Sequence, residues 1–173
     1  QPPPHWEGLA PDPLNPYSVT KVAAEKLCKM YYDLFGLHSV VFRYFNVYGP
    51  REPVKGQYAP VIGRFLRLRE KGEPITVVRP GNQSRDFVHV NDIVRANMAA
   101  MECDDEHANG QVFNVGTGKN ISVLDLAYRI SNEISWLPER DGEADSTLAD
   151  ISKSKNILGW EPQEDLEEYI NKE

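Results

Sequence analysis

The sequence lacks most features of secreted, membrane-spanning and metal-binding proteins. Its 173 residues include only two cysteines, Cys28 and Cys103, so no disulfide framework is expected. No apolar run approaches the roughly 20 residues that a membrane-spanning helix needs. The four histidines are scattered without metal-ligand spacing, and the proline-rich start has neither the basic nor the apolar part of a secretory signal. We therefore expect a cytoplasmic protein with no metal and no membrane partner.

A glycine-rich turn that could bind the phosphates of a dinucleotide is also missing. No G-x-G-x-x-G pattern occurs in the sequence. Gly116-Thr117-Gly118 follows a predicted strand, but it lacks the third glycine and the acidic residue that would bind a ribose. The sequence therefore contains no complete dinucleotide site.

Charge is distributed unevenly around a net value of −7. Residues 1–100 carry 13 Lys and Arg against 9 Asp and Glu, whereas residues 101–173 carry 6 against 17. The acidic total argues against nucleic acid as a partner. The basic first part suits an anionic small molecule.

Hydrophobic spacing predicts alternating helices and strands. Apolar residues at helical spacing indicate a helix from Tyr17 to Phe35, with Pro16 at its start and Gly36 at its end. Short apolar runs predict strands at 39–43, 75–78, 87–90 and 111–115. The first of these strands is expected to be buried on both faces. Further helices are expected at about 58–71, from Asn91 or Asp92 to about 101, from Ser122 to about 134, and near 150–158 and 163–172. A helix followed at once by an apolar strand is half of a parallel α/β unit, so the predicted fold class is α/β.

The most informative feature lies at the start of the first predicted helix. Asn15-Pro16-Tyr17-Ser18-Val19-Thr20-Lys21 separates a tyrosine and a lysine by about one helical turn, so both side chains rise from one face. A nearby ammonium group favours the phenolate form of a tyrosine, which makes the phenol a usable acid or base. The pattern also occurs by chance in helices that pack an aromatic side chain beside a solvated lysine. Its interpretation therefore depends on the other motifs of the chain.

Four further motifs follow in order. They are Arg43-Tyr44-Phe45-Asn46-Val47-Tyr48-Gly49-Pro50-Arg51, Gln83-Ser84-Arg85-Asp86-Phe87-Val88-His89-Val90-Asn91-Asp92-Ile93, Phe113-Asn114-Val115-Gly116-Thr117-Gly118, and Asp150-Ile151-Ser152-Lys153 with Leu158-Gly159-Trp160. The ordered set resembles the extended short-chain dehydrogenase/reductase family in its NAD-dependent epimerase/dehydratase branch. It is most similar there to UDP-glucose and UDP-N-acetylglucosamine 4-epimerases. The resemblance covers nearly the whole chain, but only the back part of the family's sequence.

This resemblance implies a fold and a set of site residues. The implied fold is the back part of a Rossmann-like parallel sheet (residues 1–50 and 86–118) plus a small mixed α/β substrate-binding region (residues 51–85 and 119–173). Tyr17 and Lys21 would be catalytic, and together with Tyr44 and Phe45 they would bind NAD. The residues implied to bind a UDP-sugar are Asn46, Val77, Val78, Arg85, Arg140, Glu143 and Thr147.

The implied substrate contacts differ in their chemistry. The guanidinium of Arg85 would pair with diphosphate oxygens, for which its planar fork is suited. Arg140 is a second phosphate ligand or a surface ion pair. Glu143 would accept hydrogen bonds from the nucleotide ribose. Thr147 would stand at the gate of the sugar pocket, where a small side chain leaves room for an N-acetyl group.

The resemblance implies an enzyme that inverts C4 of a UDP-hexose or UDP-N-acetylhexosamine through a 4-keto intermediate. A nucleotide-sugar 4,6-dehydratase or decarboxylase is an alternative, as is a non-catalytic nucleotide-sugar-binding module for this segment by itself. The family's front section, with the glycine-rich NAD turn, is missing here, so the segment alone is expected to be inactive. The stretch from Ile134 to Pro138 is shorter than in the family, as though a strand were lost. A homodimer through the Tyr17 helix is a further implication.

Overall fold

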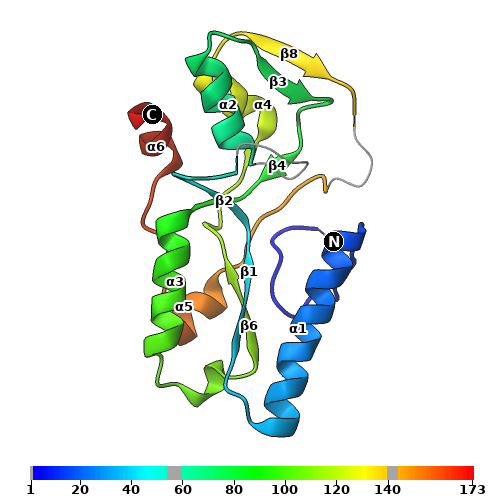
Figure 1. Cartoon of the computed structure of the whole chain (residues 1–173), viewed down its shortest axis with the longest axis vertical. Helices are drawn as coiled ribbons and strands as arrows, with labels where there is room; N and C mark the ends of the chain where they lie inside the picture. The colour runs from blue at the N-terminus through cyan, green and yellow to red at the C-terminus, as the bar shows by residue number, and fades with distance from the viewer. Residues whose placement is uncertain (1, 54–59, 140–143) are drawn as a thin grey trace.

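The computed structural model describes residues 2–53, 60–139 and 144–173. Helices and strands mix in these residues, and all but one of the strand pairs found among them are parallel. Figure 1 shows α1, β1, β6, α3 and α5 in its lower half and α2, β3, α4 and β8 in its upper half. The structure confirms the predicted α/β fold class.

Helix α1 (Pro16–Phe35) begins and ends where its sequence predicts. The side chain of Asn15 accepts a hydrogen bond from the Ser18 N–H at 2.9 Å, and the Ser18 hydroxyl accepts one in return from the Asn15 N–H at 3.2 Å. These bonds satisfy amides that have no partner within the helix. Gly36 ends the helix at φ 65°, a left-handed conformation that glycine adopts without strain.

One hydrophobic core lies around two parallel strand pairs. Strand β1 (Val40–Tyr44) pairs with β6 (Gln111–Val115), and β2 (Asn46–Tyr48) pairs with β5 (Phe87–His89). Helices α3 (Val90–Glu102) and α5 (Ser152–Leu158) pack with these strands, and a 3-10 turn, η1 (Glu106–Ala108), precedes β6. The buried residues of this core are Val88, Ala96, Ala108, Phe113, Val115, Leu158 and Trp160. Strand β1 is half-buried over residues 40–43 and exposed at Tyr44, and is therefore not buried on both faces as predicted.

A second core lies in the other half of the molecule. Helices α2 (Val61–Glu70) and α4 (Val123–Ile130) pack against β3 (Ile75–Val78), which pairs in parallel with β8 (Ile134–Leu137). Helix α6 (Leu166–Lys172) packs beside β5 and contributes Ile170 to the same core. Strand β4 (Ser84–Arg85) pairs antiparallel with β7 (Ile121–Ser122) beneath them. The buried residues of this core include Ile62, Phe65, Ile75, Val77, Leu126, Ala127, Ile130 and Ile170.

Three local predictions are wrong. Helix α4 ends at Ile130 instead of near Ile134, and Ile134 opens β8, so the strand thought to be lost is present. The error arises because Ile130 and Ile134 keep helical spacing across the turn between them. Helix α3 is capped by the His89 ring, which accepts from the Asn91 N–H at 3.2 Å, and not by Asn91 or Asp92.

Helix α2 begins at Val61, three residues later than expected; residues 58 and 59 lie outside the described part of the chain. None of the described helices is long and apolar enough to cross a membrane. Within residues 2–53, 60–139 and 144–173, no group of three or more His, Cys, Asp or Glu side chains is arranged to hold a metal ion.

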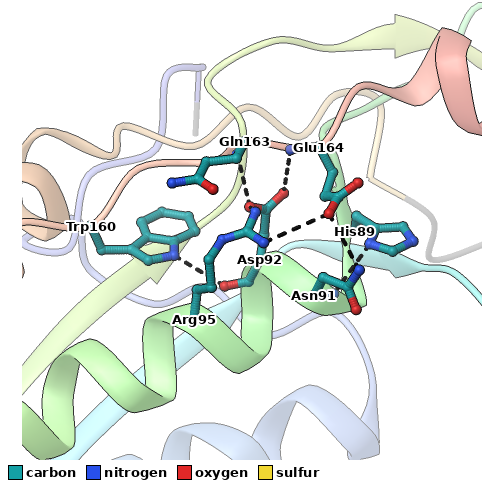
Figure 2. Close-up of polar contacts among 7 residues, drawn as sticks. All are labelled: His89, Asn91, Asp92, Arg95, Trp160, Gln163 and Glu164. Atoms are coloured by element: carbon teal, nitrogen blue, oxygen red, sulfur yellow. Dashed lines mark hydrogen bonds and ion pairs between the residues drawn. The ribbon is translucent and has the colours of Figure 1, made fainter.

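The carboxylate of Asp92 joins the C-terminal segment to the first turn of α3 (Figure 2). Asp92 is fully buried and accepts hydrogen bonds from the backbone N–H groups of Gln163 at 2.8 Å and Glu164 at 3.2 Å. Arg95, from the next turn, pairs with the same carboxylate and lies 3.6 Å from the Glu164 carboxylate. The Trp160 indole donates to the Asp92 carbonyl at 3.0 Å. The hydrogen bond that the Asn91 side chain donates to Glu164 lowers the pKa of this carboxyl, and the nearby positive charge of Arg95 lowers it further.

Replacing Asp92 with alanine should lower the free energy of unfolding by about 2–4 kcal/mol, because two backbone N–H groups and the Arg95 guanidinium lose a buried acceptor. Urea denaturation of the full-length protein measures this change. Lys172→Ala is the matched control, since the exposed Lys172–Glu168 pair is worth less than about 0.5 kcal/mol. Equal unfolding midpoints for the two variants would contradict the assignment.

Candidate functional site

The predicted catalytic pair lies on the first turns of α1. The Lys21 ammonium stands over the Tyr17 ring, 5.1 Å from its centroid. Such a position is attractive for a cation. The Tyr17 side chain is 53% exposed, so a molecule arriving from solvent can reach it. The pair is therefore assembled as the spacing of the motif predicts.

The helix that carries this pair is held against β1 by an ion pair. The Arg43 guanidinium donates two hydrogen bonds to the Glu25 carboxylate, at 2.9 and 2.8 Å, and a third to the Glu7 carbonyl at 3.2 Å. Glu25 follows Lys21 by four residues and so lies on the same helical face. Figure 1 shows the N-terminal end of α1 on the side of the molecule toward which β1 and β6 run. The Arg43–Glu25 pair therefore fixes the helix near the carboxyl ends of these strands.

The residues expected to line the cofactor and sugar lie where β1 ends and β2 begins. The Tyr44 hydroxyl exchanges hydrogen bonds with the Asn97 amide at 3.0 and 3.2 Å. The Phe45 N–H donates to the Val115 carbonyl at 2.9 Å. The chain then enters β2, where the Asn46 N–H donates to the Asp86 carbonyl at 3.0 Å. The change of partner from β6 to β5 therefore occurs at Phe45, between β1 and β2.

Two predicted sugar contacts, Asn46 and Thr147, touch each other. The Asn46 amide nitrogen donates to the Thr147 hydroxyl at 3.1 Å and to the Asp86 carbonyl at 3.0 Å. The Thr147 hydroxyl also accepts from the Asp86 N–H at 3.3 Å. Both side chains are half-buried. Residues separated by 101 positions therefore form one polar cluster.

The remaining predicted contacts are spread over the second half of the molecule. Arg85 lies half-buried on β4 and donates to the Ser84 carbonyl at 2.9 Å. Val77 is buried within β3 and Val78 is half-buried at its end. Arg140 and Glu143 lie outside the described residues. The contacts described here group Tyr17 with Lys21 and Asn46 with Thr147, and they leave β3 as a separate element.

Sequence reasoning missed the role of Asp86, whose carboxylate is buried beside the Asn46–Thr147 contact. In the sequence it stands only as one residue of the motif at 83–93. Its signal is a charged residue placed directly before the buried strand β5. A carboxylate in such a position needs several donors, because an unpaired buried charge is costly.

The chain belongs to the NAD dependent epimerase/dehydratase family, which residues 2–116 match. A UDP-N-acetyl-alpha-D-glucosaminuronate decarboxylase of Bacillus cytotoxicus is 34% identical over 89% of this chain and 50% of its own length. The chain spans about half the length of the curated relatives it matches.

Solved structures agree closely in fold. The UDP-glucuronic acid 4-epimerase of Bacillus cereus, solved with UDP-glucuronic acid and NAD, gives a TM-score of 0.88 at 33% identity, over 99% of this chain and 55% of that one. The UDP-N-acetylglucosamine 4-epimerase of Methanobrevibacter ruminantium, solved with UDP-N-acetylmuramic acid, gives a TM-score of 0.88 at 35% identity. This match covers 96% of this chain and 55% of that one.

Proposed function

We propose that the full-length protein is an NAD-dependent nucleotide-sugar 4-epimerase that inverts C4 of a UDP-hexose or UDP-N-acetylhexosamine through a 4-keto sugar. The observation that carries the proposal is the exposed Tyr17 phenol with the Lys21 ammonium 5.1 Å from its ring centroid. Family membership and the ligands of the similar solved enzymes support it.

The residues present fit the nicotinamide end of NAD. Tyr17 and Lys21 share one helical face near the carboxyl ends of β1 and β6, where cofactors bind in folds of this type. Tyr44 and Phe45 would line the same end. When bound, NAD supplies the acceptor, and later the donor, of the hydrogen at C4.

Tyr17 carries the proton chemistry in this proposal. As the C4 hydrogen leaves, its phenolate oxygen takes the proton of the C4 hydroxyl, and the C4–O bond becomes a carbonyl. The Lys21 ammonium stabilises the negative charge of the phenolate before the proton is transferred. The keto sugar then rotates in the pocket, so that the opposite face of C4 receives the hydrogen. Tyr17 returns the proton to the C4 oxygen. No atom is gained or lost, and only the configuration at C4 changes.

The rest of the chain would hold the nucleotide sugar. Arg85, with Arg140, would neutralise the diphosphate, and Glu143 would accept from the ribose hydroxyls. Backbone groups of Val77 and Val78 would meet the edge of the uracil. Asn46 and Thr147 would face the sugar. In this proposal residues 1–50 and 86–118 serve the cofactor, and residues 51–85 and 119–173 serve the nucleotide sugar.

Decarboxylation is the second candidate, because a decarboxylase is among the relatives and such chemistry can start from the same oxidation at C4. The Phe45-Asn46-Val47-Tyr48-Gly49-Pro50 stretch favours the epimerase.

We place the activity in the cytoplasm, which the free thiols of Cys28 and Cys103 support.

Removing the Tyr17 hydroxyl should abolish most catalysis. Tyr17→Phe in the full-length enzyme should lower kcat for C4 inversion at least ~100-fold, since the C4 proton then has no acceptor. Inversion of UDP-hexose is followed by NMR. The control is Tyr31→Phe, an exposed tyrosine farther along α1 that should leave kcat unchanged. Activity of Tyr17→Phe within a few-fold of the control would refute the assignment.

Enlarging residue 147 should change the choice of sugar. Thr147→Tyr should lower kcat/KM for a UDP-N-acetylhexosamine far more than for the matching UDP-hexose, because the N-acetyl group loses its space. Thr147→Val is the matched control: it removes the hydrogen bonds to Asn46 and Asp86 but keeps the size, so both sugars should be affected alike. An unchanged ratio of the two kcat/KM values in Thr147→Tyr would contradict a gate at this position.

We also propose that the full-length protein is a homodimer through α1. The helix has no buried residue, and its apolar side chains Leu27, Leu34 and Phe35 are more than half exposed. Light scattering of the full-length protein should give twice the protomer mass, and Leu34→Glu should give the protomer mass. A wild-type protomer mass at micromolar concentration would show that α1 has another role.

A further inference from the structure

The Asp86 carboxylate is the most completely satisfied buried charge near the predicted sugar contacts. The residue is 0% exposed. One carboxylate oxygen accepts from the Thr117 N–H and the Thr117 hydroxyl, each at 2.7 Å. The other accepts from the Gly118 N–H and the Ala149 N–H, each at 3.0 Å. The four donors are neutral, and three of them are backbone groups.

These bonds join three segments that lie far apart in the sequence. Thr117 and Gly118 form the turn after β6, and Ala149 follows Thr147 in the segment that leads to α5. The backbone of Asp86 binds Asn46 through its carbonyl and Thr147 through its N–H. The main chain of Asp86 therefore binds both predicted sugar contacts, Asn46 and Thr147. Its side chain binds Ala149, two residues after Thr147.

The chemistry of this position requires a carboxylate and not merely its shape. An asparagine is nearly isosteric, but its amide nitrogen would face two of the four donors whichever way the group turned. Gly116 lets the turn approach this carboxylate closely, because a Cβ there would lie 2.9 Å from a carboxylate oxygen of Asp86 and 2.6 Å from the Ala149 Cβ. The turn is thus shaped to bring its N–H groups onto the charge.

We propose that Asp86 is a positioning residue for the sugar end of the substrate. It holds the 147–149 segment against the turn after β6, and so sets where Asn46 and Thr147 stand. This inference rests on the proposed function for the identity of the ligand. Asp86 itself need not touch the substrate, so its loss should weaken binding of the nucleotide sugar more than the chemical step.

The test compares Asp86→Asn with wild type in the full-length enzyme. Calorimetry should show a Kd for UDP-hexose raised by roughly tenfold or more. KM should rise in parallel, with kcat at saturation changed less than about threefold. The control is Asp165→Asn, which also removes a carboxylate from two backbone N–H groups, at the start of α6, and should leave Kd unchanged. A lowered Tm with wild-type Kd would assign Asp86 a structural role only and overturn the proposal.

Thr117→Val keeps the test valid if Asp86→Asn does not fold, because it removes one of the four bonds to the carboxylate and leaves the three from backbone N–H groups. It also removes the bonds of the Thr117 hydroxyl to the Lys119 backbone, within the same turn. A higher Kd for this variant supports the proposal, and an unchanged one overturns it. The proposed function is tested separately by the wild-type enzyme. If wild type binds UDP-hexose without inverting C4, the proposed function fails, while the affinities still decide the role of Asp86.

Discussion

The burial of one carboxylate, that of Asp86, is the constraint on which the assembly of this molecule depends. A charge with no exposed surface is tolerated only where donors converge on it, and four do so here. Those donors belong to the turn after β6 and to the segment before α5, while the main chain of the same residue meets β2. The two hydrophobic cores adjoin this point, since β5 contributes Phe87 to one and Val88 to the other. Packing gives each half its stability, and the carboxylate fixes their connection.

The predicted catalytic pair is positioned differently, by a helix that has no buried residue. The bidentate Arg43–Glu25 pair joins this helix, α1, to β1. Arg43 sits in the same motif as Asn46, so one short stretch of sequence orients the helix that carries Tyr17 and also supplies a predicted sugar contact. In the proposed enzyme this coupling would set the distance between the proton acceptor and the sugar.

The sequence was sufficient to predict the features that depend only on neighbouring residues, such as the bounds of α1. The cap at Asn15, the left-handed Gly36 and the helical spacing between them specify α1 without reference to the rest of the chain. The contacts of Asp86 and the bond between Asn46 and Thr147 could not be found in this way, because they join residues 31 to 101 positions apart. Strand β8 was missed for a related reason: its identity comes from pairing with β3, while its spacing from Ile130 imitates a helix. The resemblance to a family gave the predicted site residues, and the structure gave the contacts of those among them that it describes.

The central claim is that Tyr17 exchanges a proton with the C4 oxygen while the C4 hydrogen leaves and returns to the same sugar. The most direct measurement uses the full-length protein with a UDP-hexose deuterated at C4, in ordinary water, and follows the product by NMR. The account predicts that the inverted product keeps its deuterium at C4, because the hydrogen never exchanges with solvent. Inverted product carrying hydrogen at C4 would contradict it.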